Sequence, residues 1–238
     1  MKIVLIGYGR MGKAIEEISV SRKHDIVQKI SSGNKNELTK ENLRLADVAI
    51  EFTSPGNAVE NIIACLEAGI PVVSGTTGWL QHYDKIRKIC LEKKGAFLYA
   101  SNFSVGVNIF FEINKRLASL MADHAAYDVS IQEIHHTQKK DAPSGTAITL
   151  AEQVLNEVHR KRKWVNDNSG NVTDLLISSK RIDPAAGTHS VKYTSDIDDI
   201  EIIHTAHNRT GFATGAVLAA EFIIGKRGIF GMKEVLGL

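Results

Sequence analysis

Cysteine and net charge are both scarce in this sequence of 238 residues. The two cysteines, Cys65 and Cys90, have neither metal-binding nor redox spacing, so we expect two small buried side chains. Lysine and arginine number 29, and aspartate and glutamate 27. The resulting net charge of +2 does not favour a nucleic-acid partner.

Long apolar runs are also missing. A membrane-spanning helix needs about 18 consecutive apolar residues, and the nearest stretch, residues 216–225, contains Glu221. The opening apolar segment, residues 3–6, is too short for the core of a signal peptide. We therefore expect a cytoplasmic protein with no membrane partner. Because 43% of the residues are hydrophobic, the chain can fill the core of one large domain or two modest ones.

The first hundred residues alternate short apolar segments with longer amphipathic ones, which is typical of βαβ units. The expected strands are residues 3–6, 25–30, 48–52, 72–73 and 97–99. The expected helices are residues 11–20, a segment that ends at Gly69, and residues 81–94. This alternation predicts an α/β fold with a Rossmann-like, doubly wound parallel sheet.

After residue 102 the pattern changes. Helices are expected at residues 105–121 and 144–162, a loose polar segment at 163–170, and strands at 129–136, 175–180, 189–194 and 199–206. The last three strands have no helix between them, which predicts a second, α+β domain with a mixed or antiparallel sheet. The final apolar helix, residues 213–224, is expected to pack on the first domain. We therefore predict a dinucleotide-binding domain of residues 1–105 with 210–238, and a substrate-binding and oligomerisation domain of residues 106–209.

A glycine motif, Gly7-Tyr8-Gly9-Arg10-Met11-Gly12, lies between the first expected strand and the first helix. Its GxGxxG spacing lets a backbone approach a pyrophosphate, and the start of the helix offers free N–H groups. A plain glycine turn is the alternative. The acidic residue that binds the adenosine ribose in NAD-preferring folds is absent, because Ser31 and Ser32 occupy its place. With Lys35 close behind, we expect NADPH to be used at least as well as NADH.

A second glycine segment, Ser74-Gly75-Thr76-Thr77-Gly78, follows the fourth expected strand. It falls at the carboxyl edge of the sheet, where ligands of open α/β folds bind. Its hydroxyl and backbone groups suit a nicotinamide or an anionic substrate, and an ordinary turn is an equal alternative.

The most specific pattern runs from His135 and His136 through Lys139 to Pro143-Ser144-Gly145-Thr146. Two imidazoles, an ammonium group and the start of a helix together predict a carboxylate-binding site that contains a proton donor. A capped helix beside a solvated basic loop is the alternative. Combined with a dinucleotide in the first domain, the pattern predicts hydride transfer to a C=C or C=N bond of a carboxylate.

These residues resemble the dihydrodipicolinate reductase family, also called 4-hydroxy-tetrahydrodipicolinate reductase, of the diaminopimelate and lysine pathway. Residues 133–146 contain its pattern H-H-x-x-K-x-D-A-P-S-G-T without a substitution. The other matching segments, in the family's order, are residues 9–12, 75–78, 100–108, 187–189 and 212–216.

The resemblance implies NADPH or NADH as cofactor, a small dicarboxylate substrate, no metal, and a homotetramer built on the sheet of the second domain. It implies cofactor contacts by Gly7, Gly9, Arg10, Met11, Gly12, Ser31, Gly75, Thr76, Thr77, Asn102 and Phe103. It implies that His135 donates a proton with the help of Lys139, and that the substrate is held by Lys139, His136, Thr77, Gly145 and Thr146. Two departures bear on cofactor choice: the chain is short between the second and third strands, and Ser31 stands where many relatives are acidic.

Two other interpretations remain open from the sequence. One is a different two-domain Rossmann dehydrogenase acting on an amino or keto acid, with a coincidental histidine-lysine loop. The other is a non-catalytic sensor that binds a dinucleotide, although a sensor has no use for a proton donor beside a carboxylate site.

Overall fold

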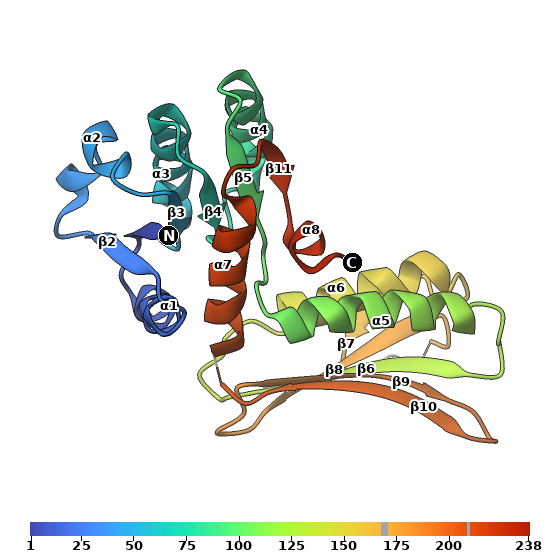
Figure 1. The fold of residues 1–238 in the computed structure, drawn as a ribbon. Helices are drawn as coiled ribbons and strands as arrows, with labels where there is room; N and C mark the ends of the chain where they lie inside the picture. Colours follow the sequence, from blue (N-terminus) through green and yellow to red (C-terminus); the bar gives the residue numbers. More distant parts are fainter. Residues whose placement is uncertain (168–170, 209) are drawn as a thin grey trace. The chain divides into compact units, whose positions relative to one another are not determined.

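The structure is a computed structural model that describes residues 1–167, 171–208 and 210–238. The chain divides into two compact units (Figure 1), of which unit 1 is Met1–Asn108 with Thr210–Leu238 and unit 2 is Ile109–Arg209. The first boundary lies inside helix α5 (Val105–Met121), three residues after the division at residue 105 that the sequence predicts.

Unit 1 contains a parallel sheet in the order β11-β5-β4-β3-β1-β2. Its strands are β1 (Lys2–Ile6), β2 (Asp25–Ile30), β3 (Val48–Glu51), β4 (Val72–Ser74), β5 (Ala96–Tyr99) and β11 (Gly228–Phe230). Its helices are α1 (Arg10–Ser21), η1 (Lys35–Glu37), α2 (Lys40–Leu43), α3 (Pro55–Ala68), η2 (Leu80–His82), α4 (Tyr83–Glu92), α7 (Thr210–Ile223) and α8 (Met232–Leu236). The predicted Rossmann-like sheet is confirmed. The prediction of five strands is wrong by one, because β11 adds a sixth strand beside β5.

The apolar strands of unit 1 are buried on both faces. Along β1, Val4 and Ile6 belong to the core on the α3 and α4 face, while Ile3 and Leu5 belong to the core shared with α1 and α7. Small side chains such as Ala216 let α7 lie close against the sheet (Figure 1). The final helix therefore packs on the first unit, as the sequence predicts.

Unit 2 contains a mixed sheet in the order β10-β9-β6-β8-β7, in which β7, β8 and β6 are parallel and the rest antiparallel. Its strands are β6 (Asp128–His135), β7 (Lys163–Asn166), β8 (Asp174–Arg181), β9 (Gly187–Thr194) and β10 (Asp199–Ala206), and its second helix is α6 (Gly145–Glu157). The predicted mixed sheet is confirmed. The predicted loose segment is wrong over 163–166, because Trp164 of β7 packs on the core of unit 2; residues 168–170 of that segment lie outside the described residues.

Helix α6 ends five residues before the predicted 162. Just beyond its last turn, the Arg160 guanidinium donates to the carbonyl groups of Met121, Ala122 and Tyr127. The amphipathic pattern therefore overestimates the length of α6.

The helices of unit 2 cover one face of its sheet (Figure 1). Val129, Ile131 and Val191 point toward α5 and α6 and form the core with them. The other face carries a row of facing side chains across four strands, Ile203, Ser190, Gln132 and Ser178. Among these, Ile203 is 60% exposed.

Two expectations drawn from composition can be compared with the structure. Cys65 and Cys90 are both buried and unpaired, as predicted. Among the described residues, no helix combines the length and the apolar character that crossing a membrane requires.

Candidate active site

The glycine motif forms a tight junction between β1, β3 and α1. Gly7 has a φ of +99°, and a Cβ on it would lie 1.9 Å from the carbonyl oxygen of Phe52. A Cβ on Gly12 would lie 2.2 Å from the carbonyl oxygen of Gly7. Only glycine fits at both places. Gly9 caps α1 without a side-chain hydrogen bond, so the first turn of the helix offers backbone N–H groups to an anion.

A cavity of about 370 Å³ opens beside this junction. The predicted cofactor residues that line it are Gly7, Gly9 and Ser31. The other lining residues are Ile6, Tyr8, Ile30, Ser32, Lys35, Phe52, Thr53, Ser54, Asn57 and Asn61. None of the described lining residues is a carboxylate, so the cavity presents hydroxyl, amide and ammonium donors.

Ser31 and Lys35 already have partners at the edge of this cavity. The backbone N–H and the hydroxyl of Ser31 donate to Oδ1 of Asn34 at 2.7 and 3.0 Å. Nζ of Lys35 donates to Oδ1 of Asn57 at 3.0 Å and lies 3.7 Å from the Glu60 carboxylate. The β2 end is therefore a hydrogen-bonded turn with one ammonium group beside it.

Glu51, which the sequence analysis does not single out, is fully buried at the end of β3. Its Oε1 accepts from the backbone N–H of Thr53 at 3.0 Å, from the Thr53 hydroxyl, and from the Thr76 hydroxyl at 2.8 Å. Its Oε2 accepts from the Ser74 hydroxyl at 2.6 Å. One carboxylate thus holds together the two loops that follow β3 and β4. A lone acid at the end of an apolar strand is the signal that could have identified it.

The remaining predicted residues of unit 1 do not line the cavity; these are Arg10, Met11, Gly12, Gly75, Thr76, Thr77, Asn102 and Phe103. Two of them contact Phe52, which does line it. A Cβ on Gly75 would lie 2.2 Å from the Phe52 ring, and the Phe103 ring centroid is 5.5 Å from that of Phe52. Arg10 and Thr77 are exposed, whereas Thr76 is buried.

In unit 2, the buried face of β6 changes from apolar to ionic toward the end of the strand. The side chains of Val129, Ile131, Glu133 and His135 share one buried face, because alternate residues of a strand point the same way. Strand pairing places Glu133 opposite His189 of β9 and opposite Ser179 of β8. The pairing therefore brings together polar groups that are far apart in the sequence.

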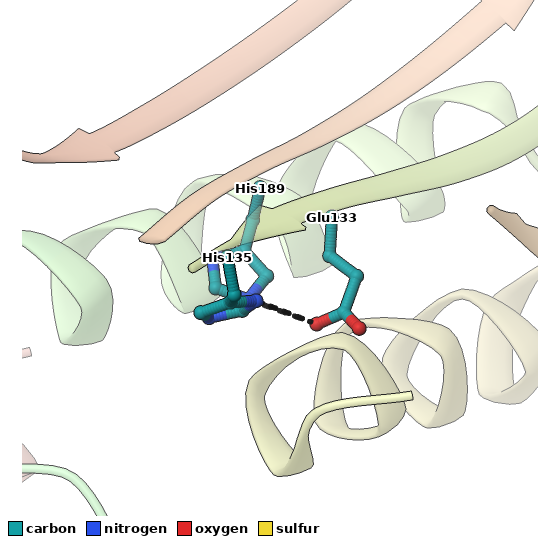
Figure 2. A group of neighbouring side chains, drawn as sticks. All are labelled: Glu133, His135 and His189. Atoms are coloured by element: carbon teal, nitrogen blue, oxygen red, sulfur yellow. Dashed lines mark ion pairs between the residues drawn. The ribbon is translucent and has the colours of Figure 1, made fainter. Parts of the chain in front are cut away.

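Glu133 is fully buried, lies beside His135 (Figure 2) and accepts from two donors. Nη2 of Arg181 lies 3.0 Å from Oε1, and the backbone N–H of Ser144 lies 3.1 Å from Oε2. Nδ1 of His135 lies 3.1 Å from Oε2, at ion-pair distance but without the alignment of a hydrogen bond. Burial alone would raise the pKa of Glu133, but the surrounding donors outweigh it and hold the pKa well below the usual range. Glu133 is therefore ionised.

His135 and His189 meet edge to face, with ring centroids 5.0 Å apart (Figure 2). Nε2 of His189 lies 3.0 Å from the Ser144 hydroxyl, and burial, followed by the charge of His135, lowers the pKa of His189 to about 4. On the other side of His135, a Cβ on Gly187 would lie 3.1 Å from Nε2. The glycine therefore keeps the space beside this nitrogen open.

Lys139 is half-buried in the loop between β6 and α6. Its Nζ contacts both carboxylate oxygens of Asp141, at 2.8 and 2.7 Å, and this contact lowers the pKa of Asp141. Ser144 caps α6 by accepting from the backbone N–H of Ala147 at 3.2 Å. Gly145 begins the helix. An anion-binding helix start and an ammonium group thus lie on the same short loop.

The other predicted substrate residues differ in exposure. His136 and Thr146 are half-buried and Gly145 is exposed. His136 makes a smaller contribution than Thr137 to lowering the pKa of Asp183. Thr77 belongs to unit 1 and the other predicted substrate residues to unit 2.

Three potential metal ligands, on Glu133, His135 and His189, lie within 4.8 Å of one another. Both oxygens of Glu133 already accept from Arg181 or Ser144, so a cation there would displace the Ser144 N–H or face a guanidinium group. The cluster is explained more simply as a hydrogen-bonded, charged network.

Four residues of the candidate site are not predicted from the sequence: Glu133, Asp141, Arg181 and His189. Glu133 could have been found, because it precedes His135 by two residues and so shares its face of the strand. Arg181 gives no local signal, because only the alignment of β8 with β6 places it opposite His135.

Comparisons with known proteins cover nearly the whole chain. Family models described as "Dihydrodipicolinate reductase, N-terminus" and "Dihydrodipicolinate reductase, C-terminus" match residues 1–103 and 106–236. A 4-hydroxy-tetrahydrodipicolinate reductase from Christiangramia forsetii is 52% identical over 99% of this chain and 98% of its own. One from Methanosarcina barkeri is 36% identical over 97% and 83%.

Solved structures agree on the fold. A dipicolinate-bound dihydrodipicolinate reductase from Paenisporosarcina matches with a TM-score of 0.78 at 21% identity, over 98% of each chain. A putative myo-inositol dehydrogenase from Sinorhizobium meliloti matches with a TM-score of 0.58 at 10% identity, over 99% of this chain and 93% of its own.

Proposed function

Because this chain belongs to the dihydrodipicolinate reductase family, we propose that it uses NAD(P)H to reduce dihydrodipicolinate, derived from 4-hydroxy-tetrahydrodipicolinate, to tetrahydrodipicolinate. The chain is an oxidoreductase of that family. The proposed reaction is a step of diaminopimelate and lysine biosynthesis. The observation that carries the mechanism is the ionised Glu133 beside His135, next to the loop of Lys139.

The cavity of unit 1 fits a dinucleotide. The close approach at Gly7 and Gly12 leaves the start of α1 open to a pyrophosphate, and Ser31, Ser32 and Lys35 offer donors to a ribose or its phosphate. A reduced nicotinamide supplies the hydride when bound. Since no carboxylate lines the cavity within the described residues, we propose that NADPH is used at least as well as NADH.

The loop from Lys139 to Thr146 suits a dicarboxylate. The Lys139 ammonium would bind one carboxylate, and the backbone N–H groups of Gly145 and Thr146 would bind another, with His136 and Thr77 contributing as the family resemblance implies. The Asp141 carboxylate forms an ion pair with the Lys139 ammonium in this structure. The substrate carboxylate would therefore replace or share that contact.

His135 is suited to donate a proton through Nε2. Its Nδ1 lies 3.1 Å from an oxygen of ionised Glu133, which orients the ring with Nδ1 toward the carboxylate. Nε2 lies on the open side left by Gly187. The substrate gains a hydride at one carbon of the reduced bond and the Nε2 proton at the other atom; solvent then restores the proton to His135. Lys139 steadies the charge that develops on the substrate.

We propose that the open face of the second sheet is covered by self-association into a homotetramer. The row from Ile203 to Ser178 carries an apolar side chain that is 60% exposed among small polar ones. Association of identical faces is a common way to cover such a surface. Light scattering at micromolar concentration tests this, and a monomer would contradict it.

The activity is tested by following NADPH or NADH oxidation with dihydrodipicolinate formed in situ from pyruvate and aspartate semialdehyde. We expect oxidation that depends on this substrate and a His135→Gln variant that is about 10² to 10⁴ slower with a nearly unchanged KM, because a general acid acts in the transition state. His159→Gln, on an exposed histidine, is the control. NAD(P)H oxidation with a keto acid instead would favour the other dehydrogenase interpretation.

A further inference from the structure

Arg181, the last residue of β8, bonds to three separate segments of unit 2. Its Nη2 donates to Oε1 of Glu133 at 3.0 Å and to the carbonyl oxygen of Asp141 at 2.6 Å. Its Nε donates to the carbonyl oxygen of Lys139 at 3.3 Å, and its Nη1 to that of Lys180 at 2.9 Å. One guanidinium therefore connects the carboxylate beside His135 with the loop that carries Lys139.

The register of the sheet explains why this arginine reaches both places. Strands β6 and β8 are parallel, and Arg181 pairs with His135 at the point where both strands end. The chain then continues from β8 to Asp183, whose carboxylate accepts from the backbone N–H and the hydroxyl of Thr137 at 3.1 and 2.6 Å. The end of β8 thus holds the loop between β6 and α6 at its beginning and in its middle.

The contacts of Arg181 determine where the backbone of Lys139 lies. The carbonyl groups of Lys139 and Asp141 point at the same guanidinium, which fixes the turn between them. A lysine side chain has many rotamers, and one ion pair by itself stabilises a single rotamer only slightly. The position of its ammonium group relative to His135 therefore depends on how firmly this turn is held.

We propose that Arg181 is a positioning residue that fixes the position of Lys139 relative to His135. The affinity for a dicarboxylate then depends on an arginine outside the substrate site. The proposal rests on the proposed function. A guanidinium is required because its planar fork binds the carboxylate and two carbonyl groups together, whereas an ammonium is a single point donor.

The test compares Arg181→Lys and Arg181→Met with Arg116→Met, which removes an exposed arginine of α5. Binding of dipicolinate to the full-length protein is measured by calorimetry with reduced dinucleotide present, together with steady-state constants and melting temperatures. For Arg181→Lys we expect dipicolinate affinity and substrate KM to weaken about ten-fold, which corresponds to about 1.4 kcal/mol. We expect the dinucleotide KM to stay within about two-fold. We expect kcat to fall by less than the substrate KM weakens, because Lys139 also steadies the developing charge while Glu133 keeps a cationic neighbour. For Arg181→Met, kcat should fall further.

Dipicolinate affinity unchanged in Arg181→Lys would overturn the proposal. Equal losses for dipicolinate and dinucleotide would also overturn it, because they would show a merely structural role. Wild-type protein that neither oxidises NAD(P)H with the substrate nor binds dipicolinate would instead overturn the proposed function, so the two failures are distinguishable. We expect Arg116→Met to keep the wild-type dipicolinate affinity, steady-state constants and melting temperature.

Discussion

Among the described residues, each unit buries one carboxylate beside a loop of the proposed site, and the two carboxylates differ in the side chains that donate to them. Glu51 in unit 1 accepts from the hydroxyls of Thr53, Thr76 and Ser74 and from one backbone N–H. Glu133 in unit 2 accepts from a guanidinium and a backbone N–H and lies beside an imidazole. Hydroxyls can turn and accept as well as donate, whereas guanidinium and backbone N–H groups can only donate.

This difference separates a carboxylate that connects two loops from one that lies beside the proposed proton donor. Around Glu51 the hydrogen-bond directions can be rearranged without stranding a buried group. Around Glu133 they cannot, because an ionised acceptor is the only group that satisfies every neighbour. The buried carboxylate is then in place to orient the His135 ring, as the proposed role of His135 as proton donor requires.

Glu133→Gln should have the largest effect. Whichever way the new amide turns, its NH₂ faces either Arg181 or the backbone N–H of Ser144, so one donor is left unmatched. Breaking a buried ion pair costs about 3–5 kcal/mol, and we expect a much lower melting temperature and a kcat about 10²-fold lower. A variant with wild-type kcat would contradict the assignment of Glu133 as the orienting group.

Acid should destabilise the neighbourhood of Glu133 through His189. The folded pKa of His189 is about 4 and its unfolded pKa about 6.5, so unfolding takes up a proton between these values and stability falls as pH falls through that window. The loss at about pH 5, relative to neutral pH, is about 2 kcal/mol. Glu133 contributes its own stability above its unfolded pKa of about 4.3 and loses it only at lower pH.

Thermal melting near pH 5 and pH 7.5 measures this effect. His189→Gln should shrink the difference between the two melting temperatures, while the exposed-site control His159→Gln should leave it unchanged. If the difference between the two melting temperatures is as large in His189→Gln as in the wild type, other groups cause the acid sensitivity.

Ser31→Asp brings a carboxylate into the cavity of unit 1, which has none among its described lining residues. A carboxylate there would accept from the adenosine ribose and repel a 2′-phosphate, so the preference should move toward NADH by about ten-fold, or about 1.4 kcal/mol. The ratio of kcat/KM for NADPH and NADH, at one stated ionic strength, measures the change. Ser32→Asn, also at the cavity, adds no charge and serves as a control. If Ser31→Asp leaves the ratio of kcat/KM for NADPH and NADH unchanged, other residues determine the cofactor preference.

Glu51→Gln should have the smallest effect. The amide oxygen can keep the bonds from Thr53 and Thr76, and the NH₂ can donate to Ser74, whose hydroxyl turns to accept. We expect the dinucleotide KM to rise by less than about three-fold, with no change in the dicarboxylate KM. A loss as large as that of Glu133→Gln would erase the distinction between the two carboxylates.

Much of the fold follows from local pattern, and the exceptions are instructive. The apolar runs identify nine of the eleven strands found in the described residues. The two missed strands, β7 and β11, are edge strands of four and three residues. Their pairing with β8 and β5 makes them strands, and a sequence pattern does not contain that pairing.

The candidate site also has one part that a local sequence pattern predicts and one part that it does not. The GxGxxG junction is predictable because its geometry is set by glycines within six residues of one another. The network around His135 depends on the alignment of three strands, which brings Arg181 and His189 to a carboxylate from 48 and 56 positions along the chain. Residue types alone therefore identify the histidines and the lysine, and they leave out the groups that orient them.

The two-segment composition of unit 1 has a consequence for its synthesis. One face of its sheet is covered partly by α7, whose residues Ala213, Ala216 and Val217 are made only after all of unit 2. At about 5–20 residues per second, the ribosome needs roughly 5–20 seconds to translate the intervening segment. During that interval Ile3, Leu5 and Ile50 lack part of their cover. The first unit therefore completes the cover of this face only after unit 2 has been made, whereas unit 2 is continuous in sequence.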